Sequence, residues 1–374
     1  MKLKQINLKR YRNISDICLS PCDQINIICG DNAQGKTNIL ESIWLFTGNP
    51  SFKTTKNYEL IQQNEKQAEL SICFEDTKRE QKAQIKISNQ KKLWLNQVPL
   101  KKSSDLSGHF YCVIFSPLDA DLIKGSPKAR RHFIDLALSQ LTPQYIQYLT
   151  IYEKLLLQRN ALLKELYHHP HLKNTLDIWD LQLSKTGTII SIYRKDYIYQ
   201  LEKIVKKIYN GISSGEEQIQ IQYLSSAFEE INTISSYEDK HIQYYFDKLQ
   251  SCLEQDIKCG FTSVGIHRDE LDIHINQMSA KTFGSQGQQR SCILALKLGE
   301  AALLKQTTKE DPIILLDDVM SELDNKRQNY ILNHVKGQQV FITCCDKSTL
   351  QQLRQGKIFE IRQGRIVNVT DLNI

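Results

Sequence analysis

The sequence lacks the features that would place it in a membrane, outside the cell or around a zinc ion. No window approaches roughly 18 consecutive apolar residues, the length that a membrane-spanning helix needs. Residues 1–6 carry lysine but no apolar stretch like that of a secretory signal. Ten cysteines are present, yet none forms a C-x-x-C pair, and Cys29, Cys112 and Cys344 lie in apolar runs. We therefore expect a cytoplasmic protein whose cysteines are buried free thiols.

The composition is typical of a globular protein with only a small excess of positive charge. The 374 residues exceed one ordinary compact domain, which indicates two domains or one large split domain. Hydrophobic residues make up 41% and charged residues 24%. Lys and Arg number 48 against 42 for Asp and Glu, so the net charge is +6. This excess permits nucleic-acid binding but does not argue for it alone.

The pattern of apolar residues changes twice along the chain. Short β-type runs come first, helical spacing dominates residues 128–259, and β/α alternation returns after residue 260. The simplest architecture is one α/β domain built from residues 1–127 and 260–374, with a helical insertion at 128–259. The expected strands cover residues 3–8, 24–29, 69–74, 83–87, 111–115, 271–275, 313–316, 339–343 and 357–361. The expected long helices cover residues 145–166, 175–209, 288–305 and 326–335.

A phosphate-binding loop stands near the N-terminus. Residues 24–29 predict a strand, residues 30–37 (GDNAQGKT) match G-x-x-x-x-G-K-[ST], and residues 38–46 predict an amphipathic helix. The glycines let the backbone fold around phosphate oxygens, and its N–H groups and the helix N-terminus attract anions. We expect Lys36 to reach the β- and γ-phosphates and Thr37 to ligate Mg²⁺. The predicted nucleotide contacts are Gly30, Asp31, Asn32, Ala33, Gln34, Gly35, Lys36, Thr37 and Asn38.

A second acidic site follows far along the sequence. Residues 313–316 form an apolar run that ends in Asp317 and Asp318, the Walker B pattern. A buried strand can aim Asp317 at the shell of a Mg²⁺ ion, and Asp318 can polarise an attacking water molecule. The catalytic residues predicted from sequence are therefore Lys36 and Asp318, and the predicted metal ligands are Thr37 and Asp317.

Four shorter features stand where ABC-type ATPases have functional elements. Ser285, Gly287 and Gln288 open a predicted helix and resemble the ABC signature, which in that family contacts the γ-phosphate of ATP held by a second subunit. Residues 321–324 (SELD) stand at the spacing of the D-loop, and Thr343 stands where the switch residue lies. Residues 116–119 (SPLD) are the segment expected at the glutamine loop. A Ser hydroxyl, a Gly and a helix N-terminus suit a second anion site.

These motifs and several others occur in the same order as in the RecF family, and the sequence resembles that family along its whole length. Arg12 and Asn13 resemble that family's Arg-Asn element, which approaches the nucleotide. Residues 265–271 (GIHRDEL) resemble its G-P-H-R-D-D-L, with Ile266 in place of Pro and Glu270 in place of Asp. Other matching segments are residues 36–43, 114–117, 125–131, 158–163, 285–290 and 316–324.

The resemblance implies an SMC-like ATPase head with a short helical lobe instead of a long coiled-coil arm. It implies ATP-driven homodimerisation, binding of single- and double-stranded DNA, weak DNA-stimulated ATPase activity, and a role with RecR and RecO in placing RecA at single-strand gaps. Arg130 and Arg131 are candidates to face the DNA backbone, and a solvated helix face is the alternative for both.

Three other classes share parts of the pattern. A monomeric small-molecule P-loop kinase would have no use for the Ser285 segment. An ABC transporter subunit would need a membrane partner, and its ATPase domain fits poorly with the long terminal β segments and the helical lobe. A DNA-binding protein with a vestigial ATP site would not need the intact set of Lys36, Thr37, Asp317 and Asp318.

Overall fold

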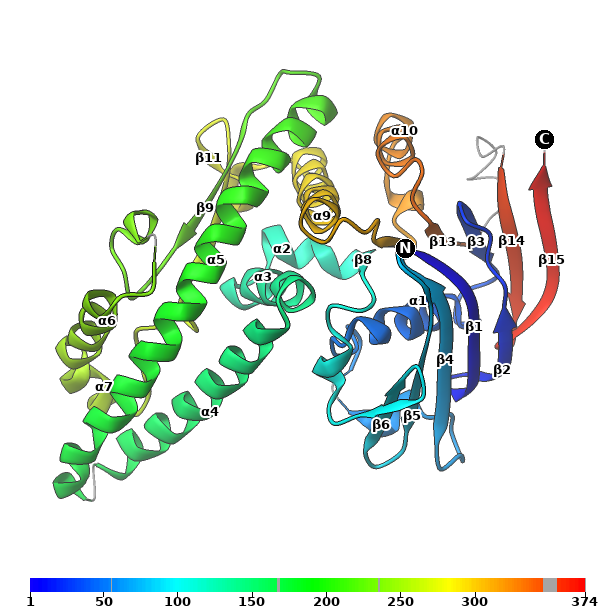
Figure 1. The fold of residues 1–374 in the computed structure, drawn as a ribbon. Helices are drawn as coiled ribbons and strands as arrows, with labels where there is room; N and C mark the ends of the chain where they lie inside the picture. Colours follow the sequence, from blue (N-terminus) through cyan, green and yellow to red (C-terminus); the bar gives the residue numbers. More distant parts are fainter. Residues whose placement is uncertain (55, 167–168, 235, 346–354, 374) are drawn as a thin grey trace. The chain divides into compact units, whose positions relative to one another are not determined.

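The computed structural model describes residues 1–54, 56–166, 169–234, 236–345 and 355–373 (Figure 1). The chain forms two compact units: unit 1 comprises Met1–Asp119 and Ile293–Ile374, and unit 2 comprises Ala120–Cys292. Segments from both ends of the sequence therefore share unit 1. The division at residues 127 and 259, made from the apolar pattern, stays a prediction.

The first sheet of unit 1 is antiparallel, with strand order β2-β1-β4-β5-β6-β7. Its strands alternate buried and exposed residues, which is typical of a sheet with one covered face. In β1 the buried residues Leu3, Ile6 and Leu8 break strict alternation, and the register against β4 shifts between Leu3 and Gln5. A bulge there keeps all three side chains on the covered face. The strands are β1 (Lys2–Tyr11), β2 (Ile14–Leu19), β4 (Ala68–Glu75), β5 (Glu80–Ile87), β6 (Lys91–Leu95) and β7 (Val98–Leu100).

The second sheet of unit 1 has the order β15-β14-β3-β13-β12-β8 and is parallel except for β15 (Figure 1). Its central strands are almost entirely buried, which explains their continuous apolar runs. Pairing of β3 with β13 and of β13 with β12 brings residues near 27, 342 and 316 together. The strands are β3 (Ile25–Cys29), β8 (Cys112–Phe115), β12 (Ile313–Leu316), β13 (Val340–Cys344), β14 (Gln355–Arg362) and β15 (Arg365–Asn373).

Helix α1 (Lys36–Trp44) buries Ile39, Leu40 and Ile43 in unit 1. It continues as a 3-10 turn, η1 (Leu45–Thr47), and ends at Gly48 in the left-handed conformation. Helix α9 (Gln286–Thr308) contains the boundary between the units. The remaining short elements are η2 (Asn57–Leu60), η3 (Ser103–Leu106), η4 (Pro117–Ala120), η7 (Met320–Glu322) and α10 (Asn325–His334).

Unit 2 is mainly helical, and its two long helices, α4 (Pro143–Glu165) and α5 (Leu176–Ser213), pack against each other (Figure 1). Pro143 stands in the first turn of α4, where a missing N–H costs nothing. The other elements are α2 (Asp121–Lys124), α3 (Pro127–Leu141), η5 (Pro170–Thr175), β9 (Ile219–Leu224), η6 (Ile231–Thr233), α6 (Asp239–Ser251), α7 (Leu253–Cys259), β10 (Glu270–Ile275), β11 (Met278–Ser279) and α8 (Ala280–Phe283).

Strand β9 lies in the region that was expected to be helical throughout. It forms the edge of a three-stranded sheet, β11-β10-β9, and alternates buried and exposed residues along its length. The sequence IQIQYL carries this two-residue period, which is the signal that predicts a strand. This strand was not predicted, because helical spacing dominates the sequence on both sides of it.

Other sequence expectations concern membranes and thiols. Within the described residues, no helix is both long enough and apolar enough to cross a membrane. Cys29, Cys112 and Cys344 are buried, as predicted, whereas Cys18, Cys259 and Cys345 are exposed, contrary to the expectation that the cysteines are buried.

A fully buried arginine joins three helical segments of unit 2. Arg159 of α4 donates from Nε to Asp180 of α5 at 2.5 Å and from Nη1 to Asp256 of α7 at 2.7 Å. All three side chains have 0% exposure. Nη1 also donates to Thr262 Oγ1 at 2.9 Å. The charges are stable only as a set, because each buried ion needs its partner.

We expect Arg159→Met to destabilise the protein by about 3–5 kcal/mol, because it leaves two buried carboxylates without a cation. Urea unfolding followed by circular dichroism measures the change. Lys154→Met, on the exposed face of the same helix, is the matched control and should change stability little. Equal unfolding midpoints for the two variants would contradict the structural role of Arg159.

Candidate nucleotide site

The loop between β3 and α1 has the tight backbone that phosphate binding requires. A Cβ atom on Gly30 would lie 2.3 Å from the Ile361 carbonyl oxygen, and one on Gly35 would lie 2.8 Å from Asn13 Oδ1. Gly35 also has a φ of +107°, a conformation that favours glycine. Ala33 adopts a left-handed φ of 64° without being glycine. The two glycines therefore allow neighbouring chain segments to close against the loop.

Lys36 and Thr37 are the first residues of α1. The Lys36 ammonium group bonds to the phosphate loop, and the Thr37 hydroxyl group bonds to Asp317. Lys36 is 5% exposed, and its Nζ donates to the carbonyl oxygens of Gly30 at 2.8 Å and Asp31 at 3.1 Å. Thr37 Oγ1 donates to Asp317 Oδ1 at 2.8 Å. The lysine ammonium thus lies over the loop, while the threonine connects the loop to the end of β12.

Asp317 and Asp318 follow the buried strand β12, as predicted from the Walker B pattern. The Asp317 carboxylate is buried and accepts hydrogen bonds from Thr37 and, at 3.0 Å, from Thr343 Oγ1. Burial raises the pKa of Asp317, and the hydrogen bonds from the two hydroxyl groups act against this rise. An all-oxygen set of one hydroxyl and one carboxylate suits a magnesium ion.

Thr343, at the end of β13, contacts both acidic residues. Besides its bond to Asp317, its Oγ1 accepts the backbone N–H of Asp318 at 2.8 Å. Asp318 has a φ of 53°, an unfavourable conformation for a residue with a side chain, so this hydrogen bond helps hold its backbone. The structure brings Lys36, Thr37, Asp317, Asp318 and Thr343 to one end of the parallel sheet.

The two side chains of the Arg-Asn element have different partners, one in α1 and one in the phosphate loop. Arg12 binds Glu41 of α1 through Nε at 2.9 Å and Nη2 at 2.6 Å, and Glu41 is fully buried. Asn13 instead contacts the loop: its Nδ2 donates to the Ala33 carbonyl oxygen at 2.9 Å, and its Oδ1 accepts from Asn38 at 2.9 Å. The sequence resemblance predicted a nucleotide contact for Arg12 and named Asn13 only as part of the Arg-Asn element. Direct contact between Arg12 and a nucleotide stays a prediction.

The signature residues lie at the start of α9 and bond to one another. Ser285 N–H donates to Gln288 Oε1 at 2.8 Å, and Gln288 N–H donates to Ser285 Oγ at 3.2 Å. Ser285 is exposed, and among the described residues its hydroxyl proton has no protein acceptor. Gly287 lies between the two partners, in the first turn. This arrangement leaves a hydroxyl donor at a helix N-terminus.

The D-loop and glutamine-loop segments also have defined contacts. Ser321 Oγ donates to the Asp318 carbonyl oxygen at 2.7 Å, and Asp324 caps α10 by accepting the Arg327 N–H at 2.9 Å. In the segment after β8, Asp119 accepts the Ser116 N–H at 2.6 Å. Burial raises the pKa of Asp119, and nearby Lys297 opposes the rise.

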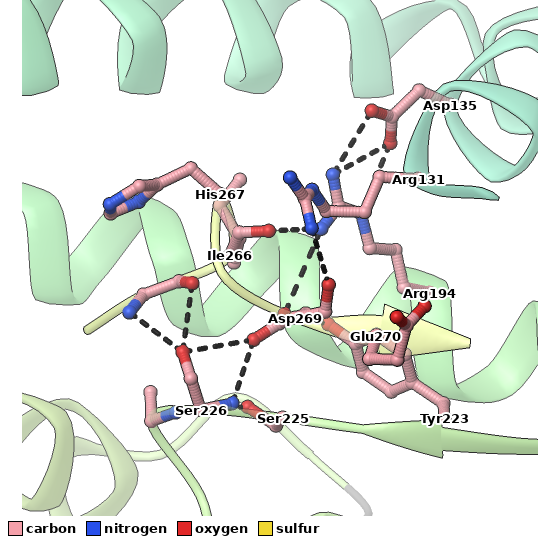
Figure 2. Close-up of polar contacts among 12 residues, drawn as sticks. Arg131, Asp135, Arg194, Tyr223, Ser225, Ser226, Ile266, His267, Asp269 and Glu270 are labelled. Carbon is pink, nitrogen blue, oxygen red and sulfur yellow. Dashed lines mark hydrogen bonds and ion pairs between the residues drawn. The ribbon is translucent and has the colours of Figure 1, made fainter. Parts of the chain in front are cut away.

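Residues 265–271 form a buried polar centre in unit 2 (Figure 2). Arg194 of α5 donates to Asp135 of α3 at 2.9 Å and to the Ile266 carbonyl oxygen at 2.7 Å. Asp269 lies 3.7 Å from Arg194 and also accepts from Tyr223 and from the Ser226 N–H. The motif therefore has a structural role that its sequence did not reveal.

The arginines near this centre differ in their exposure and in whether a carboxylate neutralises them. Arg130 is 5% exposed and forms a bidentate pair with Glu270 at 2.6 and 2.7 Å, so its expected exposure toward DNA is wrong. Arg130 is a buried arginine that Glu270 neutralises, so it stabilises the fold instead. Arg131 is half-buried and donates to the Asp269 carbonyl oxygen at 2.7 Å. Arg268 is exposed, and among the described residues neither Arg131 nor Arg268 has a carboxylate ion pair.

Both of these arginines lie close enough to His267 to affect its ionisation. Burial lowers the pKa of His267 to about 4, against an opposing hydrogen bond with the Thr262 carbonyl oxygen, and the charges of Arg268, Arg131 and Arg159 lower it further. His267 is therefore neutral near pH 7, and its Nδ1 lies 3.0 Å from the Tyr152 hydroxyl.

Comparisons with known proteins agree with the fold and the motifs. A family profile described as AAA ATPase domain matches residues 1–325. The DNA replication and repair protein RecF of Acetivibrio thermocellus is 38% identical over 365 residues, which cover 97% of this chain and 98% of that protein. RecF of Ruminiclostridium cellulolyticum is 39% identical over 374 residues, covering 98% of this chain and 99% of that protein.

Solved structures give the same result. The recombination mediator protein RecF-ATPrS in the RecFOR pathway superimposes with a TM-score of 0.91 and 34% identity, over 97% of both chains. An Smc head bound to the C-winged helix domain of ScpA has a TM-score of 0.57 and 15% identity, over 100% of this chain and 99% of that one, and shares the fold alone. The molecule contains an ATPase domain, and its fold is shared with an Smc head. It belongs to the RecF family of DNA replication and repair proteins.

We expect Thr343→Val to slow ATP hydrolysis about tenfold or more while ATP binding persists, because Asp317 and the Asp318 backbone lose their shared partner. Single-turnover hydrolysis and nucleotide binding measure the two effects. Thr343→Ser keeps the hydroxyl group and should retain most activity. Hydrolysis by the valine variant at the wild-type rate would show that Thr343 does not position the acidic residues.

Proposed function

We propose that this chain is an ATP-dependent DNA clamp of recombinational repair and replication restart. Two protomers close on ATP, hold DNA, and separate after slow hydrolysis. The observation that carries the proposal is the meeting of Thr37, Asp317, Asp318 and Thr343 beside the phosphate loop. Membership of the RecF family supports the DNA-repair role.

Each residue of the site has a role that its contacts support. Lys36 binds the β- and γ-phosphates from its position over the loop. Thr37 and Asp317 supply oxygen ligands for Mg²⁺, which neutralises phosphate charge when it is bound. Asp318 accepts a proton from the attacking water molecule. The weak, DNA-stimulated ATPase activity acts as a switch, and its chemistry does not alter the DNA bases.

The signature completes the site from a second copy of the chain. In our proposal Ser285, Gly287 and Gln288 of one protomer approach the γ-phosphate bound by the other. The exposed hydroxyl of Ser285 at the start of α9 supports this role, because a helix N-terminus and a hydroxyl donor both attract phosphate. ATP then acts as the ligand that joins two subunits.

DNA binding is proposed to depend on backbone phosphates. Arg131 and Arg268 are the candidates in unit 2, since their guanidinium groups are anchored on backbone carbonyl oxygens and lack carboxylate partners among the described residues. Such contacts position DNA of any sequence, single- or double-stranded. RecR and RecO are the proposed protein partners, and loading of RecA at single-strand gaps is the proposed outcome. A solved relative of the RecFOR pathway supports this assignment.

The composite site can be tested with two inactive variants. Ser285→Arg should leave ATP binding to the monomer intact but block dimerisation and hydrolysis, because bulk and charge fill the closing surface. Lys36→Met should prevent productive ATP binding. A mixture can build one site with both defects and one with neither, so part of the DNA-stimulated ATPase activity should return.

Asp318→Asn is the informative companion, since it keeps the shape of the site but weakens the base. ATP-bound dimers of this variant should accumulate on DNA in sedimentation experiments. If the two inactive variants never complement and each stays monomeric with ATP, the site is not shared. The rival function, a monomeric small-molecule P-loop kinase, would then be favoured.

A second prediction concerns the DNA contacts. We expect Arg131→Ala combined with Arg268→Ala to weaken binding equally for unrelated DNA sequences and to reduce the slope of log affinity against log salt by about 1 to 2. Fluorescence anisotropy over a salt series measures both quantities. Lys154→Ala, at an exposed lysine of α4, is the control. An unchanged salt slope would exclude these arginines as phosphate contacts.

A further inference from the structure

Strand β9 of unit 2 has one bonded edge and one open edge. It pairs with β10 in antiparallel register, and among the described residues no strand is paired with its other side. The Asn276 N–H donates to the Gln218 carbonyl oxygen at 2.9 Å, and bonded pairs recur at every second residue of an antiparallel ladder. The backbone N–H and C=O groups of Ile219, Ile221 and Tyr223 therefore point away from β10.

One side chain partly occupies this open edge. Glu202 of α5 accepts the outward N–H of Ile221 through Oε1 at 3.4 Å, which is long for such a bond. The same oxygen pairs with Lys206 Nζ at 2.8 Å. Within the described parts of the chain, the carbonyl oxygens of Ile219, Ile221 and Tyr223 have no protein donor. Glu202 thus stands in for one carbonyl oxygen that a neighbouring strand would supply.

A groove of about 710 Å³ lies beside this edge, between β9 and α5. It is lined by residues 220–223 of β9 and, from α5, by Ile198 and Tyr199 among others. Tyr199 is 60% exposed, and the Nζ atom of Lys203 lies 3.8 Å from the centre of its ring. Ligand pockets typically measure about 300–1,000 Å³. The groove therefore has room for a short segment of chain, but not for a second folded copy.

The inner side of β9 is firmly anchored. The side chains of Ile219 and Ile221 are buried, and the Tyr223 hydroxyl group donates to the buried carboxylate of Asp269 in the polar centre of Figure 2. A strand held in this way needs no ordering before a ligand binds, which lowers the entropic cost of binding. The open edge is thus a preformed template for a further strand.

The charges and side chains of the groove indicate which ligand fits. Asp196 and Glu202 are each paired with a lysine at 2.8 Å, so the carboxylates of the groove are neutralised. The exposed side chains of β9 beside it include the neutral amides of Gln220 and Gln222. An extended peptide offers N–H and C=O groups in the alternation that this edge requires, and its side chains alternate between the two faces. Apolar side chains on one face would cover Tyr199, and polar ones on the other would lie beside the two glutamines.

We propose that β9 and α5 form a docking site for an extended, uncharged segment of a partner protein, which joins the three-stranded sheet as a further strand. The N–H of Ile221 passes from Glu202 to a carbonyl oxygen of the segment, while Glu202 keeps its ion pair with Lys206. Apolar side chains of the segment pack on Tyr199. The site lies within unit 2 and uses neither nucleotide nor DNA, so it goes beyond the proposed clamp and does not depend on it.

The test measures binding of short fluorescent peptides to the full-length protein by anisotropy, without nucleotide or DNA. The probes are a set of uncharged peptides in which valine, isoleucine or tyrosine alternates with threonine. A matched set is N-methylated at adjacent central residues, which blocks both edges of the peptide but keeps its side chains. Members of the first set should bind saturably, and N-methylation should weaken their binding about tenfold or more, because hydrogen bonds to the open edge are lost.

Variants of the protein locate the binding site. Tyr199→Glu should weaken binding about tenfold, because it replaces an aromatic contact with a charge. Glu202→Ala should strengthen binding about threefold, because it frees the N–H of Ile221 for the peptide. Tyr237→Glu, at an exposed tyrosine of unit 2 that does not line the groove, is the matched control and should bind as wild type does.

The proposal is overturned if no unmethylated probe binds saturably, or if N-methylation and Tyr199→Glu both leave binding unchanged. A second copy of the chain is the other possible occupant, so sedimentation of the protein alone is measured in parallel. A dimer that forms without nucleotide and that Tyr199→Glu dissociates would assign this edge to self-association and refute the peptide site. Failure of the proposed clamp would leave all of these results unchanged, because ATP and DNA are absent from the experiment.

Discussion

The hydrogen bond between Thr37 and Asp317 is the contact on which the nucleotide site depends. It joins residues separated by 280 positions, and it can form only because β3, β13 and β12 pair in register. Carboxyl ends of parallel strands meet at one edge of a sheet, so the loop after β3 and the acids after β12 must face the same region. Thr343, at the end of the strand between them, then reaches Asp317 and the backbone of Asp318 without any change in the chain path.

Unit 2 is held together by a different kind of constraint. Arg159 and Arg194 are both buried, and each bonds to groups from several elements of this unit. A network of this type adds little stability over an apolar core, but removal of one member leaves an unpaired charge. It therefore restricts which helices and turns can pack together. The motif at residues 265–271 is explained largely by this requirement, since Ile266 and Asp269 both contact Arg194.

Sequence could predict the parts of the molecule that depend on local pattern. The phosphate loop, its helix and the apolar strand before Asp317 have fixed spacing and strong periodicity, and the structure has them where expected. Pairings between distant side chains leave no such pattern. Nothing in the sequence near Arg130 shows that Glu270 neutralises it, and nothing near Asn13 shows that it contacts Ala33. Tertiary contacts decide both roles, which is why Arg130 was misassigned and Asn13 was missed.

The contacts of Ser285 bear on the order of events in a clamp of this kind. Its oxygen already accepts the Gln288 N–H, and the Gln288 side chain binds both Ser285 and Glu217. These bonds already give acceptors to some of the N–H groups at the helix N-terminus. A free phosphate ion would therefore gain little by binding there. A phosphate already fixed on a partner's loop has a far higher effective concentration at this site. In the proposed clamp, nucleotide binding to the loop therefore precedes engagement of the signature. Loss of the γ-phosphate then removes the group that holds the two proposed surfaces together.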